Sequence, residues 1–90
     1  MSETSDALLK KGCEKLKCDR TYVLEIADAV AEVMGTSDET VCVGMALQIT
    51  AAGGLEKHAA TMTPDSEWIL NVYPKLREAL NYPPMEVPNA

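Results

Sequence analysis

The chain has 90 residues, enough for one small domain with a modest core. Fourteen acidic against eight basic residues give a net charge of −6, which argues against direct binding to nucleic-acid backbones or anionic membranes. Hydrophobic residues make up 47% of the chain, but there is no Phe, so the core must consist of Ala, Val, Leu, Ile and Met, a composition that favours close-packed helices.

Three cysteines, Cys13, Cys18 and Cys42, leave at least one thiol unpaired. The N-terminus is polar, unlike a signal peptide, and the longest uncharged apolar run is too short to span a bilayer. We therefore expect a soluble protein of the reducing cytoplasm, without membrane association.

The first predicted helix covers residues 2–17 and is amphipathic. Ser2 or Ser5 could cap its N-terminus, and Asp6 would lie in the first turn, where a carboxylate complements the helix dipole. The apolar positions are Leu8, Leu9, Cys13 and Leu16, and the basic ones are Lys10, Lys11, Lys15 and Lys17. Because lysines near a helix C-terminus also complement the dipole, we interpret the basic face as solvated surface.

A second helix is predicted over residues 20–34, with Asp19 as its N-cap and Gly35 as its C-cap. Apolar residues recur at intervals of three and four along one face, at Val23, Ile26, Ala27, Val30, Val33 and Met34. Three acids, Glu25, Asp28 and Glu32, lie together on the opposite face.

The uncharged stretch 41–52 is the segment against which we expect the other helices to pack. A capping-box pattern precedes it, with Thr36 as N-cap and Glu39 three residues on. Its residues also alternate as a strand would, but a capping box has no use before a strand and a lone strand would lack a partner. We therefore predict a central helix over about 40–52. A stripe of small or polar residues should let another helix approach closely; it consists of Thr40, Gly44, Gln48 and Ala51.

After two glycines, residues 55–62 are predicted to form a short helical turn. Thr63 as N-cap and Pro64 at the first helical position then predict a last helix that reaches residue 81. Pro74 lies inside that helix and should kink or divide it, since it has no N–H to donate.

The predicted fold class is therefore all-α, a bundle of four or five helices in a single domain at residues 1–82. Residues 83–90 contain three of the five prolines of the chain and should form a flexible tail.

Catalytic and metal-binding patterns are weak. Cys13, Cys18 and Cys42 with His58 are the residue types of a zinc site, but their spacing is not that of a structural zinc motif. Cys42 and His58 could pair as nucleophile and base, yet the apolar surroundings of Cys42 should raise the pKa of its thiol, which opposes activation. We expect no metal, no cofactor and no enzymatic activity, and we expect His58 at the surface.

A helix-turn-helix is the main alternative to a protein-binding function. The turn would be Gly53-Gly54 and the recognition helix would be residues 55–62. That helix carries one Lys, whereas DNA-binding helices usually supply several cations to phosphates. The lysines of the first helix could make those contacts instead, so a dimeric DNA-binding regulator stays an alternative.

The distribution of charge is the most informative functional feature. Between residues 21 and 56 there are six acids and no Lys or Arg, while the rest of the chain holds eight of each sign. A polar helix face explains the acids but not the absence of bases, because ordinary helix surfaces mix the two. We interpret the acids as a surface that meets a basic surface on another protein.

Aromatic residues add candidates, because Trp and Tyr often anchor protein interfaces. Trp68 is expected in the core and Tyr82 at the surface. The predicted partner-binding residues are Glu25, Asp28, Glu32, Asp38, Glu39 and Tyr82. The predicted function is a small acidic, non-enzymatic interaction module, an inhibitor or regulator; the second alternative is a structural subunit that associates with itself, for example as a homodimer.

Overall fold

The computed structural model describes residues 3–80, and within that range the chain forms helices only. The elements are α1 (Glu3–Leu16), α2 (Arg20–Met34), α3 (Glu39–Ala52), α4 (Leu55–Ala59), η1 (Trp68–Val72) and α5 (Tyr73–Ala79). The predicted all-α bundle is confirmed, whereas residue 82 and the predicted tail at 83–90 lie outside the described residues. No helix within 3–80 is long and apolar enough to cross a membrane.

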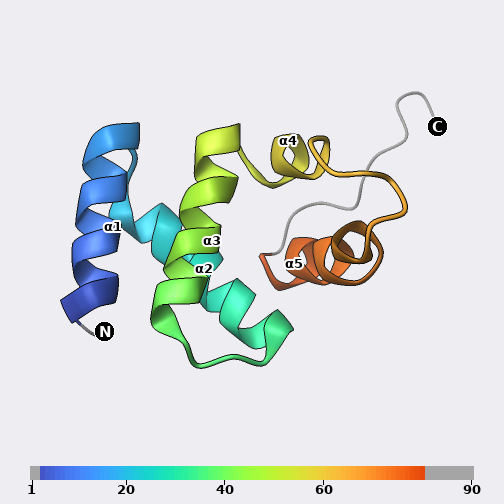
Figure 1. Cartoon of the computed structure of the whole chain (residues 1–90), viewed down its shortest axis with the longest axis horizontal. Helices are drawn as coiled ribbons and strands as arrows, with labels where there is room; N and C mark the ends of the chain where they lie inside the picture. Colours follow the sequence, from blue (N-terminus) through green and yellow to red (C-terminus); the bar gives the residue numbers. More distant parts are fainter. Residues whose placement is uncertain (1–2, 81–90) are drawn as a thin grey trace.

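Helix α3 is the centre of the bundle (Figure 1). It lies beside α1, crosses α2, and leads through a tight turn into α4, and it contacts all three of these helices. The π-helical turn η1 and α5 form one continuous segment that packs against α2 and α4. The acidic helix α2 is therefore held between the central helix on one side and the last helix on another.

The central segment is a helix, as predicted, and not a strand. Its buried side chains point in several directions because helices cover it on more than one side; they are Cys42, Val43, Ala46, Leu47 and Ile49. Thr50 satisfies its hydroxyl within the helix, since its Oγ1 donates to the carbonyl of Ala46 at 2.8 Å. A surface helix needs a polar face, but α3 does not, because neighbouring helices cover most of its surface in place of solvent.

The close approach between helices occurs at Gly12, not at the predicted Gly44. A Cβ atom added at Gly12 would lie 2.5 Å from Cδ1 of Leu47, so α1 and α3 can pack at this distance only because the position is glycine. A Cβ at Gly44 would meet nothing nearer than Cδ2 of Leu8 at 4.0 Å. The prediction for the Gly44 stripe is wrong, because Leu8 of α1 lies at an ordinary contact distance from Gly44 and the stripe residues Gln48 and Ala51 are exposed.

Several predicted helix caps are confirmed and others are shifted. Asp19 caps α2 by accepting from the N–H of Thr21 at 2.8 Å, and Gly35 follows α2 in the left-handed conformation. The cap of α3 is Asp38, which accepts from the N–H groups of Thr40 and Val41.

Thr36, predicted as that cap, accepts instead from the N–H of Asp38 at 3.1 Å and so orients the true capping residue. Ser5 is also no cap, because α1 already begins at Glu3, and the alternative cap Ser2 lies outside the described residues. The predicted cap Thr63 is displaced as well: residues 63–66 form a turn, and Ser66 accepts from the N–H of Ile69 at 3.2 Å. Nearby capping residues compete, and the chain path selects among them.

One of the two outcomes predicted for Pro74 is observed, because two short helical elements meet at Tyr73: η1 ends at Val72 and α5 begins at Tyr73. The preceding turn is widened to a π-helix, in which the N–H of Tyr73 bonds to the carbonyl of Trp68 five residues back. A wide turn accommodates the proline ring, which would otherwise collide with the carbonyl of Leu70 in a regular α-helix.

Arg77 fastens the last helix to α4. It is 9% exposed, and its Nη1 donates to Oε1 of Glu56 at 2.7 Å and to the hydroxyl of Tyr73 at 3.0 Å. The hydrogen bond to Glu56 raises the pKa of the Arg77 guanidinium, so the group stays charged despite its burial. This partly buried ion pair was not foreseen from the sequence, because the two residues lie 21 positions apart.

Trp68 and His58 form a second contact between the same segments. The two rings meet edge to face with centroids 5.1 Å apart, and Trp68 stacks on Tyr73 at 5.9 Å. Trp68 is half-buried against the core. His58 is half-buried rather than at the surface as predicted, and desolvation lowers its pKa. Met34 is a further correction, since it is 43% exposed although its spacing placed it on the buried face.

Candidate functional site

The acids of the central third of the chain lie along one part of the surface. Glu25, Asp28 and Glu32 are exposed on α2, one helical turn apart, on the side away from the buried residues of that helix. Asp38 and Glu39 are exposed where α3 begins. Within residues 3–80, the three carboxylates of α2 make no hydrogen bond or ion pair with the protein.

The sixth acid of this run belongs elsewhere. Glu56 lies on α4 and is the partner of Arg77. Its side chain, although 65% exposed, already has a cation at 2.7 Å. The acidic surface is therefore limited to the five predicted residues on α2 and α3, and the predicted Tyr82 lies outside the described residues.

A groove between α2 and the end of α5 contains all three carboxylates of α2. Glu25, Asp28 and Glu32 form one wall together with Ala29, and Ala79 and Leu80 form the other. Its volume is about 410 Å³. This groove was not predicted from the sequence, because residues 79–80 come next to α2 only through packing of the last helix.

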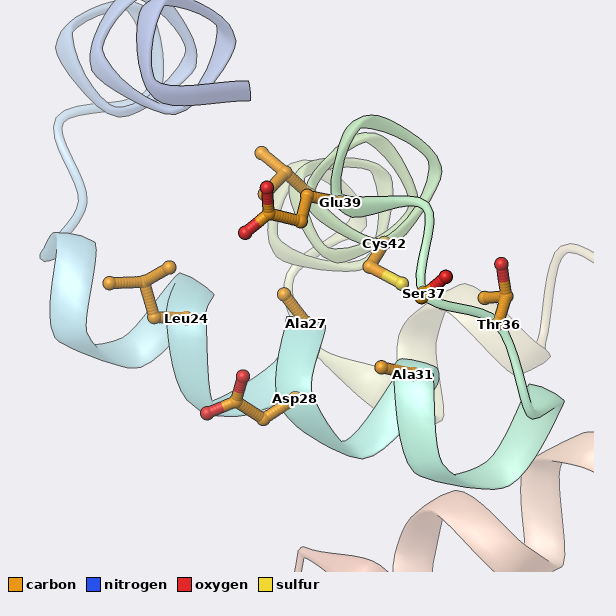
Figure 2. A pocket seen from close by; sticks show the side chains of 9 residues that line it. Leu24, Ala27, Asp28, Ala31, Thr36, Ser37, Glu39 and Cys42 are labelled. Atoms are coloured by element: carbon orange, nitrogen blue, oxygen red, sulfur yellow. The ribbon is translucent and has the colours of Figure 1, made fainter. Parts of the chain in front are cut away.

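A smaller hollow lies between α2 and the start of α3 (Figure 2). Its floor is made of small and apolar side chains, and its edge carries carboxylates; the lining residues are Leu24, Ala27, Asp28, Ala31, Thr36, Ser37, Glu39, Cys42 and Val43. With a volume of about 120 Å³ it is well below the roughly 300–1,000 Å³ of common small-molecule sites. Asp28 borders both this hollow and the larger groove.

Cys42 shows that the acids of the two helices act on a common region. Burial raises the pKa of its thiol, and the negative charges of Asp38, Asp28 and Glu39 raise it further. These carboxylates come from α2, the connecting loop and α3. The field they create disfavours a second anion and attracts a cation, so Cys42 remains a neutral thiol here, as predicted.

The weak chemical patterns find no support from the arrangement of residues. Cys42 lies in the first turn of α3 and His58 beyond its last turn, so about 15 Å of helix separates them at 1.5 Å per residue. Among residues 3–80, no group of three or more His, Cys, Asp and Glu side chains is placed to hold a metal ion. The structure thus brings together the acids of α2 and α3 and keeps the candidate thiol and imidazole, Cys42 and His58, apart.

Comparison with known proteins adds no further information. No family model, no curated protein and no solved structure matches this chain.

Proposed function

We propose that this protein is a non-enzymatic interaction module, an inhibitor or regulator, that binds a basic surface of another protein along α2. The observation that carries this proposal is the groove between α2 and α5, in which three exposed carboxylates share one wall and have no cation as partner within residues 3–80. An anionic groove of this kind selects Lys or Arg side chains and repels acidic competitors.

The geometry fits an elongated basic segment better than a single ion. Glu25, Asp28 and Glu32 follow one another at intervals of three and four residues, so their carboxylates form a row along the helix. A helix or extended strand with cations at a matching spacing could meet all three at once. Ala29 and Leu80 supply apolar surface for the aliphatic stems of those cations.

Reversing the charge of the groove tests this function. The variant Glu25→Lys, Asp28→Lys, Glu32→Lys should lose binding to a partner captured by the wild-type protein and identified by mass spectrometry. Binding of the purified partner to the wild-type protein should also weaken as salt is added. Equal binding by the variant and the wild-type protein would refute the proposal.

A matched control separates the groove from net charge. Three exposed acids outside the groove, Glu14, Asp65 and Glu67, can be changed to Lys with the same total change in charge. This control should still bind, and thermal unfolding should show that both variants fold. If the control loses binding as fully as the groove variant, the interaction depends on overall charge and not on this site.

DNA binding is less well supported than protein binding. The helix after Gly53-Gly54 has only five residues, Leu55–Ala59, and it contains a single Lys, Lys57, and no Arg. A recognition helix in the major groove usually presents several side chains to bases and phosphates. A gel shift on genomic fragments would separate the two functions, because only a DNA-binding protein should retard them.

Self-association is a second candidate that one observation favours. Leu70 is 62% exposed on η1 and Val41 is 47% exposed on α3, and contact with a second copy would remove these large apolar side chains from water. Sedimentation of the wild-type protein and of a Leu70→Ser variant would show whether two copies of the chain associate through Leu70.

A further inference from the structure

Cys13 and Cys18, which have no role in the proposed function, lie at the end of α1 and directly after it. Helix α1 ends where Lys17 adopts a left-handed conformation with φ 56°, and the N–H of Cys18 then bonds back to the carbonyl of Cys13 at 3.1 Å. This bond across five residues, around a left-handed residue, is the Schellman ending of a helix. In that motif the side chains at its two ends meet, and here both are cysteines.

The two side chains lie near each other. The Cys18 side chain is close enough to that of Cys13 to raise the pKa of the Cys13 thiol. A disulfide requires the two Cα atoms to lie roughly 4.4–6.8 Å apart. The backbone hydrogen bond of 3.1 Å between the same two residues holds their Cα atoms close to that range.

We propose that Cys13 and Cys18 form a reversible disulfide within the chain on exposure to hydrogen peroxide, so that the corner between α1 and α2 is a site of oxidative modification. In the reducing cytoplasm that the sequence predicts, the dithiol is the resting form. Cys42 takes no part, because it is 4% exposed on α3 and lies among carboxylates.

The two thiols have different roles in this reaction. Cys18 is half-buried and reachable by peroxide, whereas Cys13 is only 5% exposed. Burial, followed by the nearby Cys18 side chain, raises the pKa of the Cys13 thiol, so Cys13 keeps its proton while Cys18 reacts. Cys18 is therefore the residue attacked first, and Cys13 resolves the product.

The chemistry balances with peroxide as the only oxidant. The Cys18 thiolate attacks one oxygen of hydrogen peroxide, the O–O bond breaks, and the other oxygen leaves as water once protonated, which gives a sulfenic acid. The sulfur of Cys13 then attacks the sulfur of Cys18 and displaces the hydroxyl, which leaves as water with the proton of Cys13. Two thiols and one peroxide give one disulfide and two waters, and a dithiol reductant reverses the step.

The sequence provides a direct test. Trypsin cleaves after Lys15 and Lys17, between the two cysteines. Treatment of the reduced full chain with one equivalent of hydrogen peroxide should remove two hydrogen atoms from its mass. Digestion should then release peptides 12–15 and 18–20 joined to each other, and dithiothreitol should separate them. The protein should stay monomeric on a non-reducing gel.

Single variants serve as matched controls. Cys42→Ser should still give the joined peptides, and Cys18→Ser should not. Cys13→Ser should leave the sulfenic acid of Cys18 open to trapping by dimedone; the half-buried Cys18→Ser keeps the test decisive if Cys13→Ser does not fold. A bond to Cys42, a disulfide between chains, oxidation of the thiols without the joined peptides, or no reaction would each overturn the proposal.

Discussion

Adding one methyl group should stabilise the protein at one helical glycine, Gly44, and not at the other, Gly12. In both Gly12→Ala and Gly44→Ala the helix gains about 1 kcal/mol of propensity, because Ala loses less backbone entropy on folding. At Gly44 the new Cβ would lie 4.0 Å from Leu8, an ordinary contact, so this variant should be about 1 kcal/mol more stable than the wild-type protein.

At Gly12 the same methyl group meets the core. Its Cβ would lie 2.5 and 2.6 Å from the two Cδ atoms of Leu47 and 3.1 Å from Cγ, so the Leu47 side chain must move. Leu47 is only 8% exposed, and overpacking a core of this kind costs about 1–3 kcal/mol. The free energy of unfolding of Gly12→Ala should therefore lie below that of Gly44→Ala by about 1–3 kcal/mol.

Urea unfolding followed through the single Trp, with thermal unfolding as a check, measures this difference. A double variant identifies its cause: with Leu47→Ala already present, Gly12→Ala should no longer carry the packing cost and should stabilise the protein. Equal stability of the two single variants, or an unchanged cost when Leu47 is absent, would refute close packing of α1 on α3 at Gly12.

Three further predictions concern titration, the buried cation and capping. Because burial lowers the pKa of His58 below its ordinary 6.5, the unfolded chain binds the proton more readily. The contribution of His58 to stability should thus be complete above pH 6.5 and be lost as the pH falls through the pKa of His58 in the folded protein. The unfolding free energies of the wild-type protein and of His58→Asn, measured from pH 7.5 to 5, should differ by an amount that follows this course. Parallel curves would contradict this prediction. Arg77→Ala should cost about 2–3 kcal/mol in unfolding free energy, because it removes buried packing and leaves the Tyr73 hydroxyl without this hydrogen bond. Glu56→Ala should cost about 1 kcal/mol or less, since water can replace the exposed carboxylate. Equal losses in urea titrations would argue against this asymmetry. Asp38→Ala should cost about 1 kcal/mol and Thr36→Ala less, and the reverse order would restore Thr36 as the cap of α3.

Local patterns in the sequence were sufficient to predict most of the helices. The spacing of apolar residues between Asp19 and Gly35 gave α2 with its correct ends, because an N-cap carboxylate and a left-handed glycine act within a few residues of each other. The acids of α2 were also predicted on one face, because helical spacing alone places them there. The charge of the candidate site was thus evident from the sequence, and so was the neutral thiol of Cys42.

Only the tertiary structure decided which residues from distant parts of the chain meet. The groove beside α2 needs residues 79–80 as its second wall, and Glu56 was removed from the acidic surface by Arg77, which lies 21 positions away. The close packing at Gly12 likewise depends on the crossing of α1 over α3. Spacing along one helix determines which face a residue occupies, but the partner of that face depends on how whole helices pack, which is the combined result of many weak contacts over the entire core.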